Sequence, residues 1–245
     1  MRKIIFKKIR FLDIDEKNLK DIIKKRGLFL FPSGPGLSTI EKDKKYHLAL
    51  QKADFVFFDS GYFVLLLKIF KKINVKKVSG YIFFKFIINY IKENKNLKIY
   101  SVDPNNELSK KNFNFYLSLG LKKKNLYKYV APNYLKDEIS DIKLAKIIKK
   151  IKPDLVLINI GGGVQEILGH FLKNQIGNNF RLICTGAAIS FFTGAQAPIN
   201  RFVDRFFLGW LLRIIFNPKI FFLRYFKAFN LFKIVKESKI KITKY

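Results

Sequence analysis

The run Asp154-Leu-Val-Leu-Ile-Asn-Ile160 leads directly into Gly161-Gly162-Gly163. The run is almost continuously apolar, which is typical of a central strand that is buried on both faces of a parallel sheet. Glycines at its end allow a tight turn into the helical segment that follows. In open α/β sheets, ligands bind beyond the carboxyl ends of the strands. We therefore expect the functional residues at this edge of the sheet.

The same alternation of short apolar runs and longer segments of helical period extends along the chain. It predicts strands at 28–31, 55–58, 98–102, 126–130, 155–160 and 182–185. It predicts helices at 38–52, 62–71, 81–93, 106–119, 136–151 and 164–173. The pattern indicates an α/β fold with a Rossmann-like, mostly parallel sheet flanked by helices. We expect residues 1–195 to form this α/β core, which would carry any catalytic site.

The composition excludes a wholly disordered chain and points to an anionic partner. The 245 residues are 49% hydrophobic, which is enough for a sizeable core. Lys and Arg number 48 against 18 Asp and Glu, giving a formal net charge of +30. Such an excess favours nucleic acid, an anionic membrane surface or a phosphate-bearing substrate as the partner.

The cysteine and histidine content indicates a reducing compartment. A single cysteine, Cys184, cannot form an intramolecular disulfide, and with His47 and His170 it has no useful zinc-site spacing. The N-terminus lacks the apolar run of a signal peptide. The uncharged stretch 182–200 contains too many small and polar residues for a membrane span. We expect a cytoplasmic protein.

Residues 196–245 are expected to form a basic, aromatic-rich appendage. From residue 195 onward the chain has eleven basic residues and only two acidic ones. Large apolar residues alternate with cations at helical intervals, which predicts two amphipathic helices broken at Asn217-Pro218. They could close over the active site and bind a membrane. They could equally pack on the sheet with their lysines in solvent.

Asp59 is the most informative candidate for catalysis. It follows the apolar run Phe55-Val-Phe-Phe58 directly and precedes Ser60-Gly61. A carboxylate at the tip of a buried strand can be held rigidly beside a ligand, as a general base must be. The alternative is that Asp59 caps the next helix, a role that Ser60 could equally fill.

Two glycine-containing turns are further candidates for ligand binding. Gly161-Gly162-Gly163 precedes a helix that contains Gln165 and Glu166, and its backbone could approach phosphate oxygens. It matches neither the P-loop nor the dinucleotide-binding spacing. The turn 31–36, Phe-Pro-Ser-Gly-Pro-Gly, also ends a strand, but an ordinary tight turn has the same composition. The pair Asp13 and Asp15 could hold a divalent metal, although so short a pattern is more typical of a loop.

A series of short motifs occurs in one order and at consistent spacings over roughly residues 28–226. The motifs are Lys42-Asp-Lys-Lys-Tyr46, Ala53-Asp54, Asp59-Ser-Gly61, Val78-Ser-Gly80, Pro153-Asp-Leu-Val-Leu157, Gly161-x-x-x-Gln165-Glu166, Thr193-Gly194, Ala197-Pro198, Leu208-Gly-Trp-Leu-Leu-Arg213 and Asn217-Pro218. Together they resemble the WecG/TagA/CpsF glycosyltransferase family. The family consists of bacterial enzymes that pass a sugar, often of the N-acetylmannosamine type, from UDP to a lipid-linked acceptor.

The resemblance implies an inverting, metal-independent transferase without a cofactor. It implies that Asp59 is the base that deprotonates the acceptor hydroxyl and that Gln165 and Glu166 help to place the nucleotide or its sugar. Family arginines from the C-terminal appendage grip the diphosphate; the matching or nearby residues here are Arg201, Arg205, Arg213 and Arg224. The implied partners are a UDP-sugar, a lipid-linked acceptor, the inner face of the cytoplasmic membrane and a possible second copy of the chain.

Several positions depart from the family pattern. Phe31-Pro-Ser33 replaces Thr-Pro-Asn, Lys77 replaces an arginine, and Gly163-Val164 replaces Pro-Lys. We expect Ser33, Lys77 and the three glycines to contact substrate, with a donor sugar or acceptor that differs from the better-known members.

Two alternatives to an enzyme stay open. The charge would bind nucleic acid non-specifically, although the sequence carries no recognisable nucleic-acid-binding motif and we expect no specific nucleic-acid partner. A non-catalytic, membrane-associated member of an envelope assembly is the other alternative.

Overall fold

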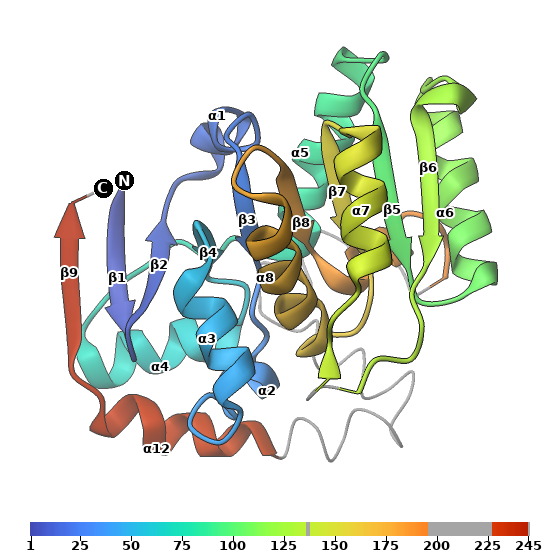
Figure 1. The fold of residues 1–245 in the computed structure, drawn as a ribbon. Coiled ribbons are helices and arrows are strands. Elements are labelled where there is room, and N and C mark those ends of the chain that lie inside the picture. The colour runs from blue at the N-terminus through green and yellow to red at the C-terminus, as the bar shows by residue number, and fades with distance from the viewer. Residues whose placement is uncertain (136–137, 196–226, 245) are drawn as a thin grey trace.

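The computed structural model describes residues 1–135, 138–195 and 227–244. These residues form an α/β structure around one nine-stranded sheet with the order β6-β5-β7-β8-β3-β4-β2-β1-β9 (Figure 1). Strands β2 to β8 pair in parallel, and β1 pairs antiparallel with both β2 and β9. The prediction of a mostly parallel sheet flanked by helices is confirmed.

All six predicted strands are present within a few residues of their expected bounds. They are β3 (Gly27–Leu30), β4 (Phe55–Phe57), β5 (Ile99–Asp103), β6 (Leu126–Val130), β7 (Leu155–Ile158) and β8 (Arg181–Cys184). Three further strands were not predicted and lie together at one side of the sheet, namely β1 (Arg2–Phe6), β2 (Ile9–Asp13) and β9 (Ile240–Lys244).

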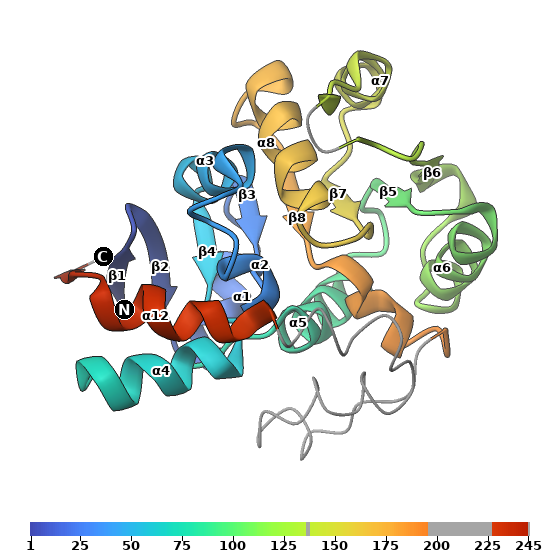
Figure 2. The same ribbon diagram turned by 90° about the horizontal axis from the view of Figure 1, so that it is seen from below.

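Helices cover both faces of the sheet. The elements are α1 (Leu19–Ile22), α2 (Gly34–Leu37), α3 (Lys44–Lys52), α4 (Gly61–Lys71), α5 (Gly80–Glu93), α6 (Asn106–Ser118), α7 (Ile142–Ile151), α8 (Val164–Ile176) and α12 (Asn230–Glu237). Helices α3, α7 and α8 lie on one face, and α5 and α6 lie on the other (Figures 1 and 2). No helix among the described residues is long and apolar enough to span a membrane.

Alternating side chains of the central strands feed two separate cores. In β7, Val156 and Ile158 belong to the core beneath α3, α7 and α8, whereas Leu155 and Leu157 belong to the core beneath α5 and α6. All four are fully buried. The period of two is the geometry of a strand with both faces covered, and it explains why this stretch of sequence contains almost no polar residue.

Two predicted helices begin later than expected, each at an aspartate that caps it. Helix α3 begins at Lys44 because the side chain of Asp43 accepts a 2.9 Å hydrogen bond from the Tyr46 amide. Helix α7 begins at Ile142, where Asp141 accepts one of 2.8 Å from the Leu144 amide. The predicted starts at residues 38 and 136 were wrong because the helical period was extended past these caps.

The β1–β2 hairpin turns through Lys7 and Lys8, which have φ values of 47° and 64°. A two-residue turn with positive φ at both positions usually contains Asn and Gly. Lysines carry no such signal, so the hairpin could not be predicted from its turn. Left-handed backbone costs an L-residue roughly 1–2 kcal/mol.

The C-terminal end of the chain returns to the sheet. Strand β9 pairs with all of β1, from Arg2 opposite Lys244 to Phe6 opposite Ile240. Helix α12 lies beside α4, and Leu231, Ile234 and Val235 are buried in the core. Residues 227–244 therefore add a strand to the sheet and side chains to its core. The expected helices around Asn217-Pro218 lie outside the described residues, and the boundary at residue 195 stays a prediction.

Candidate functional site at the carboxyl edge of the sheet

Asp59 lies two residues beyond β4, half-buried, at the carboxyl edge of the sheet. Its Oδ1 atom accepts a 2.9 Å hydrogen bond from the backbone amide of Gly80, the first residue of α5. Ser60, not Asp59, caps α4, since its Oγ accepts from the Phe63 amide at 3.2 Å. Asp59 therefore does not cap α4, which was the alternative to a catalytic role. Its carboxylate is instead held by the amide at the start of α5.

The chain segments around Asp59 approach one another at glycines. A Cβ atom on Gly34 would lie 2.9 Å from Oγ of Ser60, and one on Gly80 would lie 3.2 Å from the carbonyl oxygen of Thr185. The segments that follow β3, β4 and β8 and the start of α5 thus meet within van der Waals distance. Ser60, which follows Asp59, and Gly80, which donates to its carboxylate, are thus both closely packed against other segments.

Ser33 and Lys77 are brought to this edge by the same segments. Ser33 caps α2, and its Oγ accepts a hydrogen bond from the Gly36 amide at 3.3 Å. It directly precedes Gly34, which packs against Ser60. Lys77 is half-buried and precedes Val78, whose amide donates to the carbonyl of Phe58 at 3.1 Å. Both residues therefore lie on the loops that border Asp59, and their contact with substrate stays a prediction.

The glycine loop after β7 lies further along the same edge. Gly161 and Gly162 are exposed, and nothing lies within 4 Å of the position that a Cβ on Gly161 would occupy. The amide of Gly163, with φ of 93°, donates a 2.6 Å hydrogen bond to Oε2 of Glu166. A protein carboxylate thus already occupies the amino terminus of α8. An incoming phosphate would meet only the exposed part of the loop.

Gln165 and Glu166 are almost completely buried, with exposed fractions of 4% and 1%. Oε1 of Gln165 accepts a 2.8 Å hydrogen bond from the Gly186 amide, which ties the loop after β7 to the end of β8. Its Nε2 atom donates to Oε1 of Glu166 at 3.2 Å. In this structure, the pair holds two loops in place. Its expected contact with the nucleotide stays a prediction.

A buried polar cluster joins β5, β7 and α6 just behind the glycine loop. Asp103 is fully buried, and its Oδ1 accepts hydrogen bonds from Ser101, Asn112 and Asn159 at 2.9, 2.7 and 2.9 Å. Among the described residues, Oδ2 of Asp103 has no hydrogen-bond partner. This cluster was not predicted from the sequence, although Asn159 inside the apolar run 154–160 is a visible signal.

Thr185 is a second candidate that was not predicted from the sequence. Its side chain is 8% exposed at the end of β8, and within the described part of the chain Oγ1 has no hydrogen-bond partner. At Thr185-Gly186, as at Asp59-Ser60-Gly61, an apolar strand is followed by polar residues and a glycine. The signal that selected Asp59 could therefore also have selected Thr185. A buried hydroxyl at a ligand-binding edge can serve a ligand that reaches it.

Other candidates have structural roles or lie outside the described residues. Asp13 forms an ion pair with Arg2 at 2.7 Å and accepts a hydrogen bond from the Lys76 amide. It therefore connects the end of β2 to β1 and to the segment before α5. The described residues contain no group of three potential metal ligands. Burial, together with the charge of Glu166, raises the pKa of the Cys184 thiol well above its usual value. The expected diphosphate-binding residues that the structure does not describe are Arg201, Arg205, Arg213 and Arg224.

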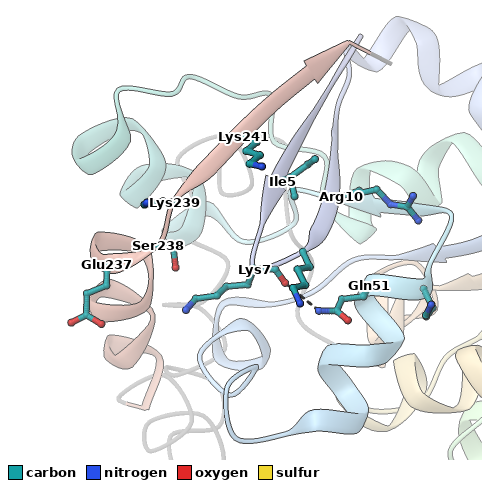
Figure 3. A pocket seen from close by; sticks show the side chains of 10 residues that line it. Ile5, Lys7, Arg10, Gln51, Glu237, Ser238, Lys239 and Lys241 are labelled. Carbon is teal, nitrogen blue, oxygen red and sulfur yellow. Dashed lines mark hydrogen bonds between the residues drawn. The ribbon is translucent and has the colours of Figure 1, made fainter.

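A basic hollow of about 730 Å³ lies at the other edge of the sheet. It opens between the β1–β2 turn, the end of α3 and the start of β9, and its lining side chains are shown in Figure 3. Six of them are cations, namely Lys7, Lys8, Arg10, Lys52, Lys239 and Lys241. Because Lys52 precedes β4 whereas Asp59 follows it, this hollow is separate from the Asp59 site.

The fold places the chain among α/β proteins that bind ligands at the carboxyl edge of a parallel sheet. A more specific assignment comes from comparison with known proteins. The model of the glycosyl transferase WecG/TagA/CpsF family matches residues 6–244. The chain belongs to this family, and the resemblance inferred from its motifs is confirmed. No curated protein sequence gives a match.

Membership of the family makes the protein a glycosyltransferase. Its partners therefore include a sugar donor and an acceptor. The match extends to residue 244, so it includes α12 and β9, which lie beyond the region of the motif resemblance.

Proposed function

We propose that the protein is an inverting, metal-independent glycosyltransferase of cell-envelope polysaccharide synthesis. It moves a sugar of the N-acetylmannosamine type, or a related one, from a UDP-sugar to a polyprenyl-diphosphate-linked acceptor. It works at the inner face of the cytoplasmic membrane. The observation that carries the proposal is the position of Asp59, a half-buried carboxylate oriented by the Gly80 amide at the ligand-binding edge of the sheet.

Asp59 acts as the general base in this proposal. Its carboxylate takes the proton of the acceptor hydroxyl while the hydroxyl oxygen forms a bond to the anomeric carbon of the donor. On the opposite face of the sugar ring, the bond to the diphosphate breaks, and UDP leaves with the electron pair. Attack from the face opposite the leaving group inverts the configuration.

One carboxylate is sufficient because the leaving group is a stabilised anion. A glycosidase needs a second carboxyl group to protonate a poor leaving alkoxide. A nucleoside diphosphate needs positive charge instead, and guanidinium groups bind phosphate oxygens bidentately. We assign this role to Arg213, with Arg201, Arg205 and Arg224 as further candidates. The exposed backbone of Gly161 and Gly162 borders the donor.

Mass spectrometry of transfer products tests the proposal directly. Purified protein is incubated with a panel of UDP-sugars and a short-chain polyprenyl-diphosphate sugar, with and without EDTA. We expect one donor to give a product heavier by one sugar, and the same rate in EDTA. No product from any donor, together with nucleic acid that stays bound after a high-salt wash, would favour the nucleic-acid alternative. Loss of transfer in EDTA would refute metal independence.

A further inference from the structure

Helices α4 and α12 lie side by side at the end of the sheet formed by β1 and β9 (Figures 1 and 2). They run in the same direction, since Tyr62 contacts Phe229 near one end and Lys71 donates to the Lys236 carbonyl at 2.8 Å near the other. Their inner sides are buried in the core through residues such as Phe63 and Leu231. We call the outer sides of these two adjoining helices the α4–α12 face.

The α4–α12 face is unusually apolar. The described residues include eleven large apolar side chains that are exposed, and five of them are on this face. They are Leu65, Ile69, Phe70, Phe229 and Phe232, with exposed fractions of 46%, 52%, 36%, 67% and 40%. A cluster of this kind on a water-facing surface marks a contact site, whereas scattered single residues need no explanation.

The same face carries cations at regular helical positions. The exposed stripe of α4 is Leu65, Lys68 and Ile69, with Lys72 just beyond the last residue of the helix. The exposed stripe of α12 is Phe232, Lys233 and Lys236, with Phe229 just before the first residue. Residues three or four apart lie on the same side of a helix, so each stripe presents apolar and basic side chains together. Neither stripe contains an acidic residue. Apolar side chains framed by lysines are the pattern of helices that lie on anionic membrane surfaces.

We propose that the α4–α12 face docks on an anionic phospholipid bilayer. Its apolar side chains enter the interface between headgroups and acyl chains, and its four lysines meet the headgroup phosphates. A second copy of the chain fits this face less well, because a symmetric contact would bring like-charged lysines together. The basic hollow adds positive potential at the same end, since Lys239 and Lys241 line both it and a smaller hollow reached by Lys71.

The position of α4 gives this docking a consequence that rests on the proposed function. Helix α4 begins at Gly61, two residues after Asp59, and Leu65 lies one turn further, about 6 Å along the axis. A bilayer that contacts the face is thus held close to the Asp59 carboxylate. An acceptor that is anchored in the bilayer could then reach the base without leaving the membrane.

Co-sedimentation of the full chain with vesicles tests the docking without any sugar substrate. The vesicles contain phosphatidylcholine alone, or phosphatidylcholine with a quarter of phosphatidylglycerol. We expect the double variant Leu65→Gln, Ile69→Gln to lower partitioning onto the anionic vesicles at least tenfold. Charge reversal by Lys68→Glu with Lys233→Glu should lower it by a similar factor on anionic vesicles and leave binding to the neutral ones unchanged.

Matched controls separate the face from general surface effects. Leu48→Gln with Ile142→Gln changes two apolar residues of similar exposure, 43% and 45%, on α3 and α7. Lys146→Glu with Lys149→Glu changes the charge on α7 equally. Both controls should bind vesicles as the wild type does. Near-UV circular dichroism verifies that every variant is folded.

Two results would overturn the proposal. One is wild-type vesicle binding by both α4–α12 variants. The other is a wild-type chain whose mass in sedimentation equilibrium exceeds the monomer while the Leu65, Ile69 variant is monomeric, which would make the face an interface between copies. Failure of the transferase proposal is distinguishable, because it would remove sugar transfer by the wild type and leave vesicle binding intact.

Discussion

The backbone amide of Gly80 donates a 2.9 Å hydrogen bond to Oδ1 of Asp59, joining the first residue of α5 to the end of β4. Gly80 is itself wedged against Thr185 and Phe31, because a Cβ there would lie 3.2 Å from the Thr185 carbonyl oxygen and 3.7 Å from Cβ of Phe31. The orientation of the proposed base thus depends on close packing between the ends of three strands.

Asp59→Asn should fold normally and lose turnover at least about 100-fold, the usual scale of general-base catalysis. The amide oxygen of the new side chain can still accept from Gly80, but it cannot take a proton from the acceptor. The matched control is Asp54→Asn at the opposite end of β4, where the carboxylate accepts from the Leu28 amide and pairs with Lys173, both at 2.8 Å. Initial rates of sugar transfer check both variants. An Asp59→Asn variant as fast as the wild type would remove Asp59 from the mechanism.

Gly80→Ala should lower kcat about tenfold or more and change stability much less. The added methyl group must displace the Thr185 carbonyl or the start of α5 by a few tenths of an ångström, and the amide that orients Asp59 moves with it. Small misplacements of catalytic groups are costly because reaction requires near-attack geometry. Steady-state kinetics and thermal unfolding measure the two effects separately. Equal kcat for the variant and the wild type would show that Gly80 does not position the base.

Gly161→Ala should leave the fold intact and raise the KM for the donor. Nothing in the described structure lies within 4 Å of the new Cβ, so unfolding is unaffected unless a ligand is present. If the donor approaches the exposed loop closely, the methyl group occupies space that the ligand needs. Donor titrations at saturating acceptor check this expectation. An unchanged KM would move the donor away from Gly161.

Lys8→Gly should raise the free energy of unfolding by about 1 kcal/mol, because glycine adopts the positive φ of 64° at no steric cost. For a chain of this size, the Tm would rise by about 2–4 °C. Lys146→Gly in the middle of α7 is the opposite control and should lower stability by a similar amount. Thermal unfolding of the three proteins decides the matter, and a lower Tm for the Lys8 variant would contradict a strained turn.

Stability should contain a tyrosine contribution that is lost in alkali. Burial and the charge of Asp141 raise the pKa of Tyr100 to about 12, and the pKa values of Tyr129 and Tyr134, which donate to Asp141, are raised as well. In the unfolded chain these groups titrate near pH 10. The folded state therefore holds the protons more tightly, so this contribution is present below pH 10 and lost as the pH rises towards 12.

Urea unfolding of wild type and Tyr100→Phe at pH 8, 9, 10 and 11 measures this contribution. Lysines lose their protons over the same range, so the informative quantity is the difference between the two proteins. The free energy of unfolding of the wild type minus that of the Tyr100→Phe variant should fall as the pH rises. A difference that is constant from pH 8 to 11 would contradict the raised pKa of Tyr100.

The C-terminal end changes how the appendage must be tested. Deleting residues 201–245 would remove β9 and α12, including buried core residues such as Leu231, and would leave β1 without its partner strand. Such a truncation could lose activity because it is unfolded. Its inactivity would therefore not show what the arginines between residues 201 and 224 contribute. Replacing Arg213 by Gln within the full chain avoids this ambiguity.

Local patterns were sufficient for the inner part of the fold. The six parallel strands and their helices could be predicted because strands buried on both faces form apolar runs, and Asp59 could be selected because it ends such a run. The strands β1, β2 and β9 could not be predicted. They contain charged residues on their exposed side, the hairpin turns through lysines, and β9 pairs with a strand more than 230 residues earlier in the chain.

The amino-acid order alone thus established the fold class, the family and the identity of the proposed base, because each shows in short local motifs and their order along the chain. Tertiary structure was needed to show that Gly80 orients Asp59, that Gln165 ties the loop after β7 to Gly186, and that α4 and α12 share one apolar, basic face. These features join segments far apart in the chain. Packing sets the distances between such segments, and no local pattern encodes them.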